Sequence, residues 1–189
     1  MPLTTYTAGE VLTAASLNAN LSFAASSPAS GLTLIASASY SSATSFTITN
    51  CFSATYRNYY LVFDSSGNNA MCTAQLAVSG VASTTGYGYQ LFEASSTASS
   101  VSRSSNQSSM NLAPLSIGGQ MDVMIYRPAL AQRTGFIIRN IYGASFSSAN
   151  PAFYDIRGIH DVATAYDSIT VTGAASGLTG KYFIYGLAE

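Results

Sequence analysis

The feature of this sequence that most constrains its fold is a two-residue alternation of apolar and polar side chains, repeated in short runs. In the first run, residues 32–40, the alternation sets Leu32, Leu34, Ala36, Ala38 and Tyr40 against Thr33, Ile35, Ser37 and Ser39. Phe46 and Ile48 continue it in residues 45–49, and residues 56–63 are rich in aromatic and β-branched side chains. Successive side chains of a strand point to opposite faces of a sheet, so these runs predict antiparallel strands with one buried face.

Strand-like runs bounded by turn residues continue along the rest of the chain. We expect them at 71–79, 87–93, 110–117, 121–127, 133–142, 153–160, 167–173 and 181–187. About ten short strands with regular turn signals are typical of a β-sandwich or jelly roll. The sequence therefore predicts an all-β fold: an antiparallel, jelly-roll-like β-sandwich at 31–189, preceded by a short arm and linker at 1–30.

The N-terminal segment has a different composition from the β-domain. Thr13 is a suitable N-cap for one short helix at 14–21, in which Leu17 and Leu21 lie one turn apart. A helix of about eight residues is marginal by itself and needs a partner surface. We expect this arm either to pack on its own domain or to attach the protein to an assembly; in the second case the attachment residues are Val11, Leu12, Leu17 and Leu21.

The segment Ala94–Ser109 consists almost entirely of Ser, Thr, Ala, Asn and Gln, with Val101 and Arg103 as the exceptions. It lacks the alternation of the other runs and predicts a long, outward-facing loop. Loops longer than about 12–15 residues are usually functional or disordered. A crossover between sheets and a binding loop are the two interpretations.

Charge and hydropathy limit the classes of partner. Charged residues make up 8% of the chain and the formal net charge is −1, so a surface of Ser, Thr and Asn offers little defence against self-association. We expect a homo-oligomer. The seven basic residues are scattered along the chain, which argues against nucleic-acid binding. No apolar window is long enough for a membrane span, and the basic and apolar segments of a secretory signal are missing, so we expect synthesis in the cytoplasm.

The two cysteines are too few for a disulfide framework. Cys51 and Cys72 are expected to be small buried thiols, since free cysteine is among the most buried residue types. A Cys51–Cys72 disulfide is the alternative if the second and fourth strands are neighbours.

No motif for catalysis, metal binding or cofactor binding is complete in the sequence. His160 is the single histidine, and Asp161 would point to the opposite face of its strand; we expect His160 at the surface, at a strand end. Asp155, Asp161 and Asp167 recur every six residues, a spacing that fits turns better than a calcium loop or a glycosidase carboxylate pair. We therefore predict a non-enzymatic protein with no catalytic residues, no metal site and no cofactor.

Thirteen tyrosines remain. Those in strand-like runs are expected to form cross-strand pairs in the core, or to make an amphipathic contact surface for another subunit or a glycan.

Three stretches carry a family resemblance. The strand-like runs 32–40 and 45–49, followed by Asn50-Cys51-Phe52-Ser53 and residues 55–63, resemble a β-domain that recurs in bacteriophage virion proteins, mostly of the tail-fibre or minor-tail type. The segments 6–18 and 180–187 are similar to the N-terminal segment and the closing strand of such proteins. The resemblance leaves residues 64–165 unmatched, and it carries no catalytic motif.

The resemblance implies a virion structural protein assembled in the bacterial cytoplasm, with a tail-fibre or tail-associated receptor-binding or adaptor role. It further implies a homotrimer with tail or capsid proteins as partners, and a glycan on the host surface as a further candidate partner. The alternatives are a capsid decoration (cement) protein and a polysaccharide-degrading enzyme similar to a tailspike.

Overall fold

The computed structural model describes residues 13–15, 18, 31–67, 70–95, 98–115, 119–142, 152–173 and 177–188. The chain separates into two units, Met1–Ser30 and Gly31–Glu189. In the first unit Ala14, Ala15 and Asn18 have helical backbone conformation. The predicted attachment residues lie outside the described residues: Val11, Leu12, Leu17 and Leu21.

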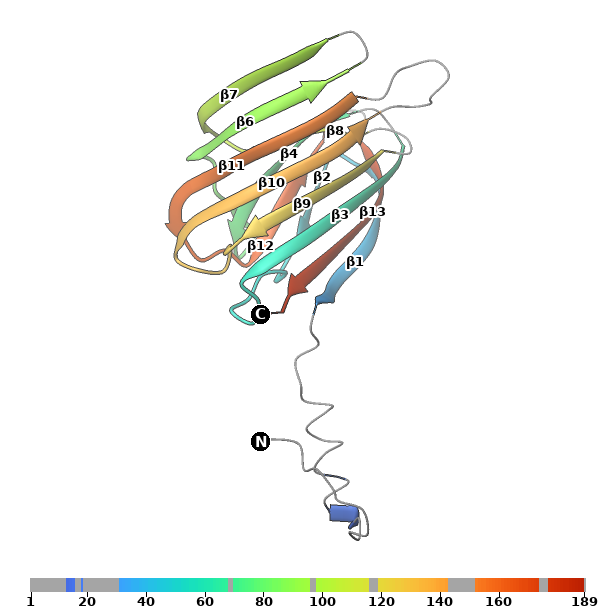
Figure 1. Ribbon diagram of the computed structural model, residues 1–189, viewed down its shortest axis with the longest axis vertical. Helices are drawn as coiled ribbons and strands as arrows, with labels where there is room; N and C mark the ends of the chain where they lie inside the picture. Colours follow the sequence, from blue (N-terminus) through green and yellow to red (C-terminus); the bar gives the residue numbers. More distant parts are fainter. Residues whose placement is uncertain are drawn as a thin grey trace, which may run out of the picture. The chain divides into compact units, whose positions relative to one another are not determined.

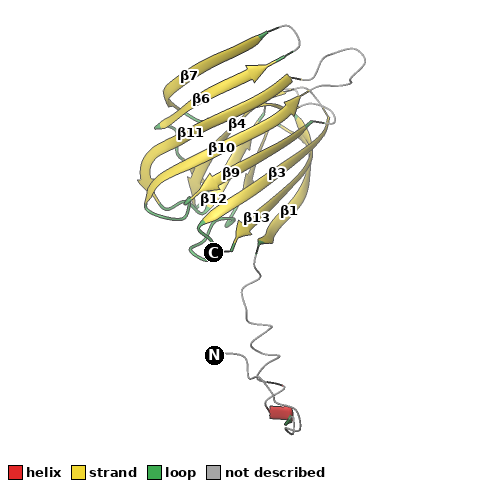
Figure 2. Ribbon diagram, viewed as in Figure 1, coloured by secondary structure: helices red, strands yellow, loops and turns green. Residues whose placement is uncertain are grey.

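The described part of the second unit consists of strands joined by short turns (Figure 2). They are β1 (Leu32–Ala43), β2 (Ser45–Ile48), β3 (Asn58–Gly67), β4 (Ala70–Val78), β5 (Val81–Ala82), β6 (Tyr87–Ala94), β7 (Ser99–Gln107), β8 (Met110–Leu115), β9 (Gln120–Tyr126), β10 (Gln132–Tyr142), β11 (Ala152–Thr164), β12 (Ser168–Thr172) and β13 (Leu178–Leu187).

The strands form two antiparallel sheets packed as a sandwich (Figure 1). The larger sheet has the order β1-β13-β3-β9-β10-β11-β6-β7, and the smaller has β2-β12-β4-β5, with β8 also paired to β4. The nested pairs β1–β13, β2–β12, β3–β9 and β4–β8 alternate between the sheets, which is the wrapping of a jelly roll. The predicted all-β sandwich is confirmed, and β10, β11, β6 and β7 widen one of its sheets.

Local sequence explains the turns as well as the strands. β4 and β5 pair through Val78 and Val81, which leaves a two-residue loop of Ser79 and Gly80. Both loop residues have positive φ, 50° and 81°, the conformation of the type I′ turn that matches the twist of a hairpin. Glycine at the second loop position adopts this conformation at little steric cost.

The core lies between the sheets and is filled by alternate residues of most strands. Across the larger sheet, a row of directly paired residues is fully or almost fully buried: Ile184, Leu61, Val123, Ile138 and Ile156. The smaller sheet contributes Leu76, Ile169 and Val171 to the same core. Each such side chain stabilises the fold by about 1.5–3 kcal/mol relative to an exposed position.

The predicted alternation of the first strand is interrupted by a β-bulge. Leu34 pairs with Tyr185 and Ala36 with the next residue, Ile184, so Ile35 is the extra residue and the strand changes face. Ala36 and Tyr40 face the core, whereas Leu32 and Leu34 are 54% and 53% exposed. The prediction that Leu32 and Leu34 share the buried face with Tyr40 is wrong.

The prediction of a loop at Ala94–Ser109 is also wrong. Ser99–Gln107 is β7, which pairs with β6 and forms an edge of the larger sheet. Nearly all of its side chains are exposed, so β7 shows no alternation because neither of its faces contributes substantially to the core. Backbone pairing with β6 holds it as a strand.

The two cysteines are free and buried, as predicted, and no Cys51–Cys72 disulfide forms. They belong to different neighbourhoods: β12 lies between β2 and β4 in the smaller sheet. Burial raises the pKa of Cys51 to about 12 and that of Cys72 to about 11. Both therefore remain protonated, and poorly reactive, at neutral pH.

A glycine in β13 gives a test of the packing between β1, β13 and β3. A Cβ atom at Gly180 would fall inside van der Waals contact of the Asp64 carbonyl oxygen and lie 2.8 Å from the Tyr40 hydroxyl. We expect Gly180→Ala to lower the free energy of unfolding by about 1–3 kcal/mol, since the backbone must shift. Urea denaturation measures this.

Gly135→Ala is the matched control, because a Cβ there meets only the Tyr126 ring at 3.5 Å, an ordinary contact. Its free energy of unfolding should equal or slightly exceed that of the unaltered protein. Equal destabilisation by the two substitutions would contradict this account of Gly180.

Candidate functional site

The outer faces of the two sheets differ in chemistry. On the smaller sheet, most side chains that face away from the core are polar: Ser45, Thr47, Thr73, Gln75, Thr170 and Thr172. The exposed large apolar side chains of this sheet are Met71, Val78 and Val81. Thr47 and Thr170 form a hydroxyl–hydroxyl hydrogen bond of 2.9 Å there. On the larger sheet, the corresponding face exposes large apolar side chains: Leu32, Leu34, Phe92, Val101, Ile141, Phe153 and Ile159. An antiparallel sheet usually presents polar residues to water, so the larger sheet has the face suited to a partner.

A charged cluster crosses the centre of this apolar face. Asp122 of β9 lies directly opposite Arg139 of β10, and Arg139 lies opposite Asp155 of β11. Arg157 follows two residues after Asp155, on the same face of β11. We call Asp122, Arg139, Asp155 and Arg157 the Asp–Arg ladder.

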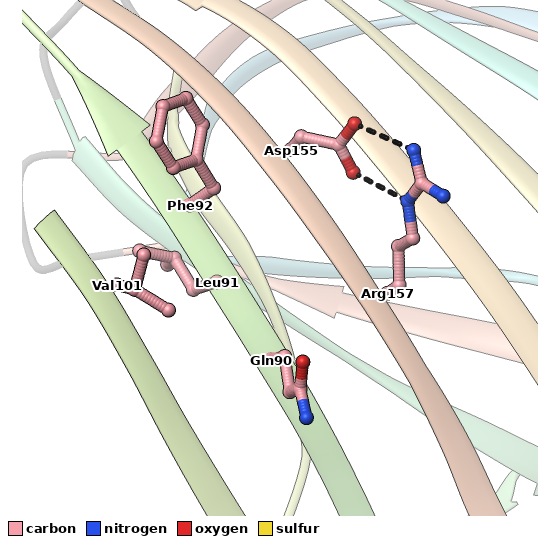
Figure 3. Close-up of a pocket in the computed structure, with 6 residues that line it drawn as sticks. All are labelled: Gln90, Leu91, Phe92, Val101, Asp155 and Arg157. Atoms are coloured by element: carbon pink, nitrogen blue, oxygen red, sulfur yellow. Dashed lines mark hydrogen bonds and ion pairs between the residues drawn. The ribbon is translucent and has the colours of Figure 1, made fainter. Parts of the chain in front are cut away.

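The ladder is held by paired hydrogen bonds. Arg139 donates from Nε to Asp122 Oδ2 at 2.9 Å, and its Nη2 lies 2.7 Å from the same oxygen. Arg157 donates from Nε and Nη2 to the two oxygens of Asp155, at 3.0 and 3.1 Å (Figure 3). These bonds from Arg157 lower the pKa of Asp155 below its usual value, and the same interaction raises the pKa of Arg157. Asp155 and Arg157 are therefore ionised and oriented at neutral pH.

Three adjoining hollows lie around the ladder. The first, about 280 Å³, is lined by Gln90, Leu91, Phe92, Val101, Asp155 and Arg157 (Figure 3). The second, about 450 Å³, shares Phe92 and Asp155 with the first and extends to Ile141 and Phe153. The third, about 540 Å³, shares Gln90 and Arg157 with the first and extends to Gly88, Arg103 and Ile159. We call these connected hollows the β6–β11 groove, because every one of them is lined by both strands.

The histidine lies elsewhere and is inaccessible, contrary to the expectation of a surface position. His160 is fully buried. Its ring stacks on Tyr87 with 4.1 Å between centroids, and its Nε2 lies 2.7 Å from the Tyr166 hydroxyl. The Tyr87 hydroxyl in turn accepts a 2.8 Å hydrogen bond from the Leu76 backbone NH of the smaller sheet. This cluster joins the two sheets and has a structural role.

The three regularly spaced aspartates do not form one site. Asp155 belongs to the ladder, whereas Asp161 pairs with Arg133. Asp167 accepts hydrogen bonds from the Ser79 backbone NH, at 3.0 and 3.1 Å, and so holds the β4–β5 turn. Asp161 and Asp167 thus have partners of their own, and only Asp155 belongs to the ladder.

Sequence reasoning missed most of the ladder and the groove. Asp122, Arg139 and Arg157 stand within apolar strand runs, in a chain where charged residues make up only 8%. The signal for this site in the sequence was the presence of isolated charged residues at alternate positions of these apolar runs. Their juxtaposition depends on the register between β9, β10 and β11, which the sequence does not state.

Within the described part of the chain, no three His, Cys, Asp or Glu side chains gather as a metal-binding group. No helix among the described residues is long and apolar enough to cross a membrane.

The buried histidine predicts a specific pH dependence. Burial lowers the pKa of His160 below its usual 6.5, against smaller opposing effects of the Gly86 carbonyl and the Asp161 carboxylate. As pH falls through about 6.5, the unfolded chain binds a proton at this residue before the folded chain does. The free energy of unfolding should therefore decrease between about pH 7 and about pH 5.5, as measured by urea denaturation.

His160→Phe keeps an aromatic ring against Tyr87 and should remove most of this pH dependence. Tyr166→Phe retains the histidine and is the control: it should lower stability at both pH values and keep the dependence. An unchanged pH dependence in His160→Phe would contradict the assignment.

No known protein-family model matches this chain, and a search of curated proteins finds no significant match.

Proposed function

We propose that this protein is a non-enzymatic structural component of a bacteriophage virion, of the tail-fibre or tail-associated type. Residues 1–30 attach it to the particle, and the jelly-roll domain presents the outer face of its larger sheet to other molecules. The observation that carries the proposal is the contrast between the two outer faces: one is mainly polar, and the other is apolar with an oriented charged cluster. Such a difference supports a domain whose function is to bind other molecules through the outer face of its larger sheet.

The chemistry of the titratable groups supports a non-enzymatic role over a tailspike-like hydrolase. A glycosidase needs one carboxyl group with a raised pKa to act as general acid. The pKa of Asp155 is lowered instead, and His160 is buried with one nitrogen engaged by Tyr166. Hydrolysis of host polysaccharide that is lost on Asp155→Asn would overturn this part of the proposal.

Assembly of several copies is supported by the β1 end of the larger sheet. Leu32 and Leu34 of β1 pair with Leu187 and Tyr185 of β13. They form an apolar strip at an edge strand, away from the ladder. We propose that copies of the chain pack through this strip, as a trimer.

A serine at the centre of the strip should weaken this association. Leu34 is 53% exposed, so Leu34→Ser removes contact area between copies without opening the core. We expect the unaltered protein to sediment at three times its 19.7 kDa chain mass, and Leu34→Ser to shift toward single chains. Val81→Ser is the control, since Val81 is also an exposed apolar side chain but belongs to the smaller sheet. A single-chain mass for the unaltered protein at micromolar concentration would refute the trimer.

Removal of the N-terminal segment tests attachment. We expect a chain lacking residues 1–22 to keep the far-ultraviolet circular dichroism of the β-domain and to be absent from purified particles. Normal copy number of the shortened protein in particles would overturn the attachment role. Copy number also separates the tail role from capsid decoration, because a tail component occurs in a few copies and a lattice component in hundreds.

A further inference from the structure

We propose that the β6–β11 groove binds an extended acidic oligosaccharide. This inference deepens the proposed function, on which it rests for the particle that would carry the site. The site itself is argued from the shape, the apolar surface and the charges of the groove.

The groove is long enough for more than one sugar ring. Its three hollows are continuous, because neighbouring hollows share Phe92 and Asp155 on one side and Gln90 and Arg157 on the other. Strand residues rise by about 3.4 Å each, so the distance along β6 from Gly88 to Phe92 alone is about 14 Å. The volumes of the hollows, about 280, 450 and 540 Å³, suit an elongated ligand made of several small units better than one compact ligand in a single deep pocket.

A glycine opens the floor of the groove. Gly88 lies opposite Ile159, in the hollow that Arg103 and Arg157 also line. A Cβ atom added there would meet its nearest neighbour, the Ser104 carbonyl oxygen, at 3.6 Å. The position has room for a side chain, and its lack of one brings a ligand close to the β6 backbone.

Two phenylalanine rings give the groove apolar surfaces. Phe92 and Phe153 are 47% and 50% exposed, and both line the second hollow. The face of an aromatic ring is electron-rich, so it attracts the C–H groups on the flatter side of a sugar ring. An exposed ring beside hydrogen-bonding groups is the combination that a polyhydroxylated ligand requires.

The ladder supplies those hydrogen-bonding groups in a fixed orientation. Each guanidinium has five N–H donors and each carboxylate about four acceptor positions. The pairs Arg157–Asp155 and Arg139–Asp122 use only part of this capacity. The remaining donors and acceptors match neighbouring sugar hydroxyls, which both donate and accept. Because the pairs already hold the side chains, binding loses less conformational entropy.

The charge balance selects an acidic sugar. Three arginines line the groove, Arg103, Arg139 and Arg157, against the carboxylates Asp122 and Asp155. Among the described residues Arg103 has no ion-pair partner, and it lies opposite Gln90 at the end of the groove away from Phe153. A uronate or phosphate group on the oligosaccharide would neutralise this excess charge.

Desolvation favours a sugar over a protein partner at this place. A protein interface would take the Asp–Arg pairs out of water, at a cost of several kcal/mol per ion unless each is fully hydrogen-bonded. A hydroxylated ligand replaces the hydrogen bonds of the displaced water and leaves the groove partly open. The β1 strip, which has leucines and no such ladder, is the part of the face suited to a protein partner.

The test uses the full chain on an array of bacterial oligosaccharides, with neutral members and members that carry uronic acid or phosphate. We expect retention of acidic members, followed by calorimetric titration of the strongest one. Phe92→Ala should weaken its affinity at least tenfold, and Gly88→Val, which fills the floor, by a similar factor. Val81→Ala, an apolar truncation on the smaller sheet, should leave the affinity within twofold.

The acidic preference has its own pair of variants. Arg103→Gln should reduce the difference in affinity between an acidic oligosaccharide and its neutral counterpart, and also the loss of affinity at high salt. Lys181→Gln removes a positive charge from β13, outside the groove, and should change neither quantity.

Several results would overturn the proposal. One is that no oligosaccharide on the array retains the protein. Another is that Phe92→Ala leaves the affinity unchanged. A third is that a groove variant alters sedimentation, because the groove would then be a contact between copies of the chain. Groove variants should enter particles at normal copy number. Absence of the unaltered protein from particles would refute the virion role and leave sugar binding to be judged on the array.

Discussion

The packing of the larger sheet on the smaller one determines what the outer face of the molecule displays. Leu61, Val123 and Ile138 occupy the core side of three neighbouring strands, so the residues next to them must point outward. A slip of one residue in β10 would bury Arg139 and expose Ile138, exchanging a core side chain for an unpaired buried charge. The apolar core therefore fixes the register, and the register places Asp122, Arg139 and Asp155 in one row. The candidate site is a consequence of core packing.

The groove uses strands that a minimal jelly roll does not need. The nested pairs of the fold involve β1, β2, β3, β4, β8, β9, β12 and β13, whereas the β6–β11 groove is built on β6, β7, β10 and β11 beside β9. β10, β11 and β6 still contribute core residues on one face, whereas β7, at the edge of the larger sheet, is exposed on both faces. Added elements change the surface while the two-sheet core stays intact, the usual way in which one fold supports different functions.

The alternation of apolar and polar residues identified most of the strands. It failed where the exposure of a residue depends on parts of the chain that are distant in the sequence. β7 was predicted as a loop because a strand with two exposed faces has no apolar side chain to mark it. Leu32 and Leu34 were assigned to the wrong face because a bulge at Ile35 changes the face to which the alternate residues of the strand point. Nothing in the local composition marks this bulge. His160 was placed at the surface because its burial depends on Tyr87, which is distant in sequence. The ladder escaped prediction for the same reason: each charge is visible, but its neighbours are set by pairing between strands.

The composition of the outer face is hard to explain by stability alone. Exposed ion pairs contribute about 0–1 kcal/mol, so the ladder adds little to the free energy of unfolding. Phe92 and Phe153 keep about half of their surface in water, where a polar residue would protect the sheet from aggregation at almost no cost to the core. The smaller sheet has that protection at most of its outward positions, where threonine and serine predominate. The same chain thus makes one outer face mainly polar, whereas the other combines half-exposed aromatic rings with oriented Asp–Arg pairs. Neither component improves folding, and their combination favours recognition of a ligand that has both C–H faces and hydroxyl groups.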